Sequence, residues 1–140
     1  MIAAVPGPVV ELGLGNGRTY DHLRQILPER EIFAFDRQID AHPDCIPDLR
    51  HLVLGDFAET LPGALERIGA RAALVHADTG TGDAQRNARL AQWLAPRLVA
   101  LTAPGGVIVS DQELGAIAAT ALPLPAGIKP GRYFLYRVAA

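Results

Sequence analysis

Residues 8–18, PVVELGLGNGR, decide which fold this sequence can adopt. An apolar run that contains one acid, Glu11, leads into three glycines at alternate positions, and an amphipathic helical pattern follows at once. Glycine is needed where the backbone takes a positive φ or where a ligand approaches closer than a Cβ permits. The segment therefore predicts a strand, a tight turn and a helix whose free N–H groups point over the turn. A glycine-rich turn without a ligand is the alternative, because one glycine motif is weak evidence by itself.

Strand and helix patterns alternate along the rest of the chain. Strands are expected at residues 8–13, 31–36, 51–56, 72–78, 107–111 and 132–138. Helices are expected at residues 17–27, near 61–68, and from 84 to the glycines at 105–106, with a kink at Pro96. This alternation predicts parallel βαβ units in a three-layer α/β sandwich.

An acidic side chain stands at or near the C-terminal end of five predicted strands: Glu11, Asp36, Asp56, Asp78 and Asp111. Aspartate is a poor strand former, and carboxylates are seldom buried without a partner. In open α/β sheets, ligands bind at the carboxyl ends of the strands, at the switch point that the first and fourth strands should flank. The acids are therefore expected to ring a crevice that suits a positively charged ligand with hydroxyl and amino groups. A helix cap or a loop hydrogen bond is the alternative for any single one.

The glycine spacing departs from the dinucleotide fingerprint G-x-G-x-x-G, because the third glycine comes one residue early, at Gly17. The pattern E-x-G-x-G-x-G over residues 11–17 resembles motif I of the class I S-adenosylmethionine-dependent methyltransferases. The segments FDR (35–37), HPDC (42–45), VHAD (75–78) and GRYFLYR (131–137) extend this resemblance to a small bacterial branch of the superfamily. It implies a Rossmann-like three-layer sandwich with a mostly parallel sheet. It also implies S-adenosyl-L-methionine as cofactor and S-adenosyl-L-homocysteine as product.

The resemblance also assigns cofactor-binding roles near the first two strands. Gly13, Gly15 and Gly17 would let the backbone approach the methionine part of the cofactor. Glu11 would hold this loop or contact the methionine amine. Asp36 would bind the two ribose hydroxyls with its two carboxylate oxygens.

Further along the chain, the resemblance places the adenine and the sulfonium. Arg37 would lie along the adenine, Asp56 would accept a hydrogen bond from its amino group, and Phe57 would offer a backbone N–H and an apolar edge. Asp78 falls at motif IV, next to the sulfonium and the acceptor.

Asp78 and His76 are the catalytic candidates, because parity places them on one strand face, where an Asp–His pair could act near the methyl group. A buried, hydrogen-bonded strand histidine is the alternative for His76. The residues expected to bind the acceptor are Tyr20, His22, Thr79 and Tyr133.

Charge and motif IV both bear on the acceptor. The formal net charge is −2, and Lys129 is the only lysine, so no basic stripe of the kind that nucleic-acid surfaces carry is visible. The segment 78–81, DTGT, lacks the proline and aromatic residues of the D/N-P-P-Y/F motif found in methyltransferases of adenine, cytosine and glutamine. These features favour a small-molecule acceptor, an amine or nitrogen heterocycle rather than an oxygen, with no nucleic acid partner.

The function expected from these residues is S-adenosylmethionine-dependent methyl transfer. A non-catalytic S-adenosylmethionine-binding module and an NAD-dependent oxidoreductase are the alternatives, since Asp36 alone could also bind an NAD ribose. The regions before residue 8 and after Asp111 are short for the superfamily, so the fold is expected to be truncated at both termini. An acceptor pocket left open in this way could be completed by another subunit, which favours a homo-oligomer, most simply a dimer.

The remaining expectations come from length and composition. The 140 residues fit a single domain spanning 1–140, and nearly half of them are apolar, which suffices for a core. One cysteine, Cys45, and no signal peptide or membrane-spanning run predict a cytoplasmic protein with no membrane partner. The acids, histidines and cysteine of residues 42–51 match no structural zinc spacing, so no metal is expected.

Overall fold

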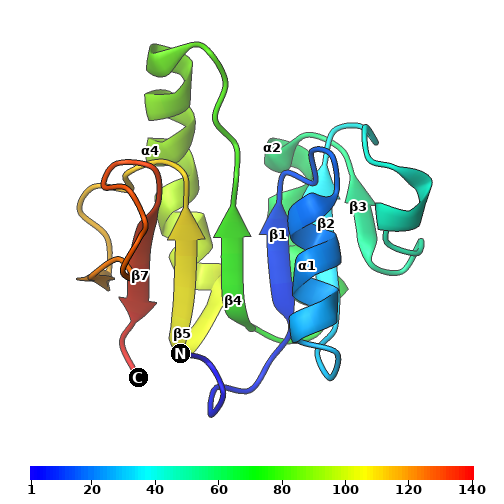
Figure 1. The fold of residues 1–140 in the computed structure, drawn as a ribbon, viewed down its shortest axis with the longest axis horizontal. Coiled ribbons are helices and arrows are strands. Elements are labelled where there is room, and N and C mark those ends of the chain that lie inside the picture. Colours follow the sequence, from blue (N-terminus) through cyan, green and yellow to red (C-terminus); the bar gives the residue numbers. More distant parts are fainter.

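Seven strands form one sheet in the order β3-β2-β1-β4-β5-β7-β6 (Figure 1). The computed structural model describes residues 1–140. Its strands are β1 (Val9–Leu12), β2 (Ile32–Asp36), β3 (Leu52–Leu54), β4 (Ala72–Ala77), β5 (Thr102–Ser110), β6 (Ala119–Leu122) and β7 (Phe134–Val138). Its helices are α1 (Arg18–Ile26), α2 (Phe57–Thr60), α3 (Ala64–Ile68) and α4 (Ala84–Leu101), with short 3-10 turns η1 (Pro43–Cys45) and η2 (Leu61–Gly63). The first five strands are parallel, and β7 is antiparallel to both β5 and β6.

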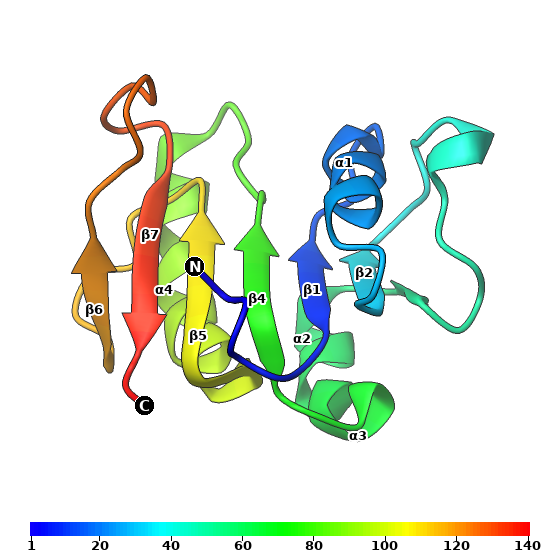
Figure 2. The same ribbon diagram turned by 60° about the horizontal axis from the view of Figure 1, so that its bottom comes forward.

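Helices cover both faces of the sheet, which gives the three layers that alternation predicts (Figure 2). Successive residues of β1 face opposite layers. Val10 and Leu12 belong to the main core cluster, to which α3 and α4 contribute. Val9 packs with Leu23 of α1 on the other face. The predicted mostly parallel α/β sandwich is confirmed, and β1 and β4 lie side by side at the switch point of strand order.

The antiparallel end of the sheet differs from the sequence prediction. One strand was expected after residue 111, but the structure has both β6 and β7, so the antiparallel pair is present within this chain. The sequence of β6, ATAL, is half exposed at the sheet edge, so burial leaves no hydrophobic signal in it. The sequence therefore predicted no strand here.

Two further differences lie at the α4–β5 junction. α4 continues through Pro96 but ends at Leu101, before the glycines at 105–106 where its end was expected, and Leu98 and Leu101 are buried in the core. β5 begins at Thr102 instead of residue 107. The register explains this early start: Ala72 pairs with Thr102 but Leu74 pairs with Val107, so residues 103–106 form a bulge inside the strand.

Glu11 is an acid in the interior of the sheet. Its side chain is 1% exposed, and its Oε2 atom is buried without a hydrogen-bond partner. Its register partner on β4 is His76, whose buried Nδ1 also lacks a partner. Burial, together with the negative charges of Asp78 and Asp36, raises the pKa of Glu11 to about 8. In the folded protein this carboxyl is therefore mostly neutral at pH 7.

None of the helices combines the length and the apolar composition that a membrane span requires.

The raised pKa of Glu11 makes a stability prediction. Between pH 4.5, where the unfolded side chain ionises, and about pH 8, the folded state holds a proton that the unfolded state has lost. This group therefore makes stability fall as the pH rises through that window. We expect Glu11→Gln to remove this contribution, so that the free energy of unfolding falls less steeply with pH in the variant than in the wild type. The two slopes should differ by up to about 1 kcal/mol per pH unit.

Urea unfolding of both proteins at several pH values across this window measures the two slopes. Contributions from other groups, including His76, are common to both proteins and cancel in the difference. Parallel slopes for wild type and variant would contradict the prediction.

Candidate active site

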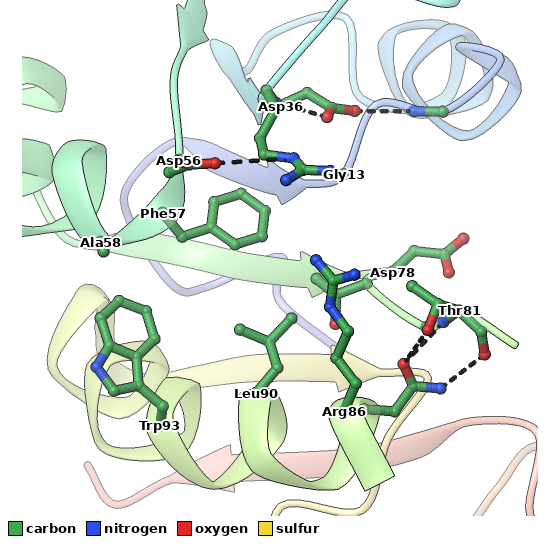
Figure 3. Close-up of a pocket in the computed structure, with 15 residues that line it drawn as sticks. Gly13, Asp36, Asp56, Phe57, Ala58, Asp78, Thr81, Arg86, Leu90 and Trp93 are labelled. Carbon is green, nitrogen blue, oxygen red and sulfur yellow. Dashed lines mark hydrogen bonds and ion pairs between the residues drawn. The ribbon is translucent and has the colours of Figure 1, made fainter. Parts of the chain in front are cut away.

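A cleft of about 480 Å³ lies at the carboxyl ends of β1 to β4 and is walled by α4 (Figure 3). This volume falls within the range of small-molecule sites. Eight residues predicted from the sequence line it: Gly13, Gly15, Asp36, Arg37, Asp56, Phe57, Asp78 and Thr79. Seven others that were not predicted line it too: Ala58, Gly80, Thr81, Arg86, Asn87, Leu90 and Trp93. The sheet thus gathers most strand-end acids into one crevice.

Asp36 holds the glycine-rich loop against the end of β2. Its Oδ2 accepts hydrogen bonds from the backbone N–H groups of Leu14 (2.9 Å) and Gly15 (3.3 Å), and its Oδ1 accepts one from Arg37 N–H (2.7 Å). A carboxylate offers about four lone-pair sites, so these bonds leave about one for a ribose hydroxyl. The first role that the structure gives Asp36 is therefore to fix the loop.

The three glycines of the loop meet different demands. A Cβ on Gly13, at φ +90°, would lie 2.2 Å from the carbonyl oxygen of Asp78, so only glycine allows β1 and β4 to end this close together. Gly15, at φ +55°, has no atom within 4 Å of such a Cβ and opens onto the cleft. Gly17 lies outside the cleft, where a Cβ would come 2.5 Å from the Cβ of Cys45. Gly13 and Gly15 thus shape the site, and Gly17 lets the loop pack on η1.

One end of the cleft combines an ion pair with apolar side chains. Arg37 Nε lies 3.7 Å from Asp56 Oδ1, and both side chains are exposed. Phe57 lines the same end, where α2 begins. Trp93 of α4 lies across from it, beside Ala58 (Figure 3). An aromatic and aliphatic wall with a carboxylate at its rim can hold a flat base that carries an amino group.

Trp93 belongs to a stripe along α4 that sequence analysis missed. Arg86, Leu90 and Trp93 are spaced i, i+4 and i+7, so they share one helix face, and Figure 3 shows all three pointing into the cleft. Trp93 was interpreted as core packing or a subunit contact. The spacing of these three residues indicates that they share one helix face. Nothing in the sequence indicates which face of α4 lies over the strand ends.

The loop after β4 is held from two sides. Asp111, just after β5, accepts hydrogen bonds from the N–H groups of Thr79 (3.2 Å) and Gly80 (2.7 Å). Asn87, in α4, donates to the carbonyl of Thr81 (2.8 Å) and accepts from its N–H (2.8 Å) and hydroxyl (2.9 Å). As predicted, Asp83 caps α4, by accepting from Arg86 N–H at 3.1 Å. This side of the site is therefore rigid.

Asp78 is the acid at the β4 end of the cleft. Partial burial and the neighbouring Asp111 raise the pKa of Asp78, and the positive charge of Arg132 opposes part of this rise. A carboxyl with a raised pKa is a stronger base than an ordinary aspartate.

His76 does not share the cleft with Asp78. Its register partner is Glu11, and its ring centroid is 6.4 Å from that of Tyr133, so the imidazole lies behind the strand ends. Burial lowers the pKa of His76, with Asp111 acting in the opposite direction, so the ring is neutral at pH 7. The structure shows no hydrogen bond between His76 and Asp78.

The other three residues of the predicted acceptor site lie outside the cleft. Tyr20 is a residue of α1 and packs against the small core clusters around Val9 and Leu14, whereas His22 is exposed on the same helix. Tyr133 is half-buried between His76 and Arg132, whose guanidinium carbon lies 5.9 Å from the tyrosine ring centroid. No group of three acidic, histidine or cysteine side chains is arranged to hold a metal ion.

The donors and acceptors of the cleft fit S-adenosylmethionine. Carboxylates line both ends, an apolar wall faces the β3 end, and the backbone at Gly15 is open to the cleft. The buried Glu11 oxygen that lacks a partner lies behind the same loop. When bound, this cofactor supplies a methyl carbon that its sulfonium has activated.

Solved structures of several methyltransferases resemble this chain. An S-adenosyl-L-methionine methyl transferase from Silicibacter pomeroyi is 48% identical, with a TM-score of 0.91 over 97% of this chain and 83% of that one. The antibiotic-resistance methyltransferase Kmr is 14% identical, with a TM-score of 0.60 over 99% of this chain and 89% of that one. The 16S rRNA (adenine(1408)-N(1))-methyltransferase from Catenulisporales acidiphilia is 16% identical, with a TM-score of 0.55 over 99% and 90%. The last two similarities show a shared fold.

These neighbours contradict the predicted partners, a small-molecule acceptor and no nucleic acid. The exclusion of nucleic acid rested on the acidic balance and on the missing basic stripe. The same fold, across 99% of this chain, serves an enzyme that is named for 16S rRNA. Net charge describes the whole surface and not the few residues beside a reacting base, so it cannot exclude such an acceptor.

No curated protein matches the chain significantly. A family model described as S-adenosyl-L-methionine methyltransferase matches residues 1–138, almost the whole chain. Together with the relative from Silicibacter pomeroyi, this match confirms the predicted enzyme class and cofactor. The chain belongs to this family of S-adenosyl-L-methionine-dependent methyltransferases.

Proposed function

We propose that this methyltransferase transfers the methyl group to a neutral nitrogen atom, in a heterocycle or an amine. The observation that carries the proposal is the separation of Asp78 from His76: the carboxyl lines the cleft, and the imidazole lies behind it. A neutral nitrogen attacks with its own lone pair and loses its proton afterwards, whereas a hydroxyl needs a base first. Asp78 stands at the β4 end of the cleft without an imidazole to act as its partner base, and this suits a nitrogen acceptor better than a hydroxyl.

Several residues have roles in this proposal. Asp78 accepts a hydrogen bond from an N–H of the acceptor and so aims the nitrogen lone pair at the methyl carbon. Gly13 and Gly15 hold the methionine part, while Asp36 fixes their loop and accepts from one ribose hydroxyl. Alignment of this kind, with water excluded, contributes several kcal/mol to methyl transfer.

The remaining proposed contacts are at the ends of the site. Asp56 and Phe57 hold the adenine, with Arg37 beside it. Thr79 and Tyr133 border the acceptor. In this proposal residues 1–140 form one cofactor-binding domain.

The substrate for which one structural neighbour is named adds support from outside the chain. The Catenulisporales acidiphilia enzyme is named for the N1 atom of an adenine, which is a ring nitrogen in a heterocycle. The low identity means that the fold is what the two proteins share. A heterocyclic nitrogen is the acceptor class on which that name and the Asp78 geometry agree.

Transfer of a labelled methyl group to a panel of acceptors tests the proposed acceptor atom. The panel contains ribosomal RNA, free nucleobases, other nitrogen heterocycles and primary amines, with phenols and catechols as the oxygen arm. We expect label on nitrogen compounds alone, and mass spectrometry then locates the methylated atom. Methylation of a phenolic oxygen at a comparable rate would contradict the proposal.

Two substitutions separate the proposed roles of Asp36 and His76. Asp36→Ala removes the acceptor for the two backbone N–H groups, of Leu14 and Gly15, that hold the glycine-rich loop. We expect the affinity for S-adenosylhomocysteine to fall by about 100-fold or more. His76→Ala should change that affinity by less than about twofold, because the ring lies outside the cleft, and should mainly lower turnover by displacing Tyr133.

Calorimetric titration of both variants with S-adenosylhomocysteine gives the comparison, and circular dichroism verifies that each is folded. Equal losses of affinity in the two variants would break this assignment of roles.

A further inference from the structure

The charges that line the cleft are unevenly paired. Asp36 accepts three backbone N–H groups, and Asp56 pairs with Arg37. The second cation of the cleft, Arg86, makes neither an ion pair nor a side-chain hydrogen bond in the structure, although its side chain points into the cleft (Figure 3). Arg86 is therefore free to bind an anionic group of a ligand.

The position of Arg86 along α4 tells which end of a ligand it would meet. Trp93 lies beside Ala58 at the β3 end, Leu90 follows in the middle, and Arg86 stands beside Asp78 at the β4 end (Figure 3). A nucleoside whose base lies between Phe57 and Trp93 would extend along this stripe toward Arg86. Arg86 and Trp93 are seven residues apart, which corresponds to about 10 Å along a helix. This distance is comparable to the length of an adenosine with a side chain attached.

The local backbone holds Arg86 in place. Its N–H donates to the capping side chain of Asp83 at 3.1 Å, and the next residue, Asn87, is buried and bonded three times to Thr81. The first turn of α4 is thereby fixed against the loop after β4. A guanidinium on such a rigid turn loses less conformational freedom when it binds a carboxylate.

We propose that Arg86 binds the α-carboxylate of the cofactor. S-Adenosylmethionine carries one anionic group, at the end of the molecule opposite the adenine, and that end falls beside Arg86 in the order just described. A guanidinium matches a carboxylate with two parallel N–H···O bonds. The proposal concerns the cofactor alone and does not depend on the identity of the acceptor.

Arg18 is the rival for this carboxylate. It is exposed at the start of α1, directly after the glycine-rich loop, but it does not line the cleft. Arg89 is an exposed arginine of α4 that does not line the cleft either. These two residues provide matched charge controls, one near the loop and one near Arg86.

A comparison of two ligands isolates the carboxylate. S-Adenosylhomocysteine carries both the amine and the carboxylate, and S-adenosyl-3-thiopropylamine retains the amine but lacks the carboxylate. Calorimetry measures the affinity of each ligand for wild type, Arg86→Met, Arg18→Met and Arg89→Met. We expect Arg86→Met to weaken S-adenosylhomocysteine about tenfold and to leave the other ligand within about twofold.

Binding of S-adenosyl-3-thiopropylamine also reports that the variant cleft is intact, and Arg86→Lys should retain part of the preference for the carboxylate. The proposal is overturned if Arg86→Met leaves both affinities unchanged or weakens both ligands equally. A selective loss in Arg18→Met or Arg89→Met would overturn it as well. No acceptor enters these titrations, so their failure is distinct from failure of the proposed nitrogen chemistry.

Discussion

The hydrogen bonds from the N–H groups of Leu14 and Gly15 to Asp36 are the constraint on which the rest of this site depends. They join the turn after β1 to the end of β2, so the backbone at Gly15 opens onto the cleft in one fixed position. Asp111 does the same for the loop after β4, where its carboxylate accepts hydrogen bonds from the N–H groups of Thr79 and Gly80. Two carboxylates therefore hold the two loops that border the cleft.

This arrangement explains how acids can crowd one edge of a sheet. Backbone N–H groups donate to these carboxylates, three to Asp36 and two to Asp111, and these bonds offset the loss of hydration. Glu11 lacks such donors at its Oε2, and its pKa rises instead. The same chemical group thus serves as a loop clamp at Asp36 and Asp111, as a neutral buried acid at Glu11, and as a carboxyl open to the cleft at Asp78.

The two walls of the cleft have different chemistry. The strand ends supply carboxylates and backbone, while α4 supplies an apolar and cationic stripe of Trp93, Leu90 and Arg86. A zwitterionic nucleoside needs both: acceptors for its hydroxyl and amino groups, an apolar surface for its base, and a cation for its carboxylate. The family shared with the Silicibacter pomeroyi enzyme fits this division. The hydrogen bonds between Asn87 and Thr81 join the two walls at the start of α4.

The sequence by itself determined the parallel sheet and the switch point between β1 and β4, because periodicity, glycine spacing and strand-end acids are local signals. The cofactor followed from the resemblance of residues 11–17 to motif I. Tertiary structure alone decided the rest. In the folded chain the Trp93 face of α4 lines the cleft, and His76 lies behind the cleft. The exposed edge strand β6 pairs with β7, and the Asp36 carboxylate accepts hydrogen bonds from the glycine-rich loop. Each of these depends on which distant surface packs against a residue, and no spacing along the chain records that.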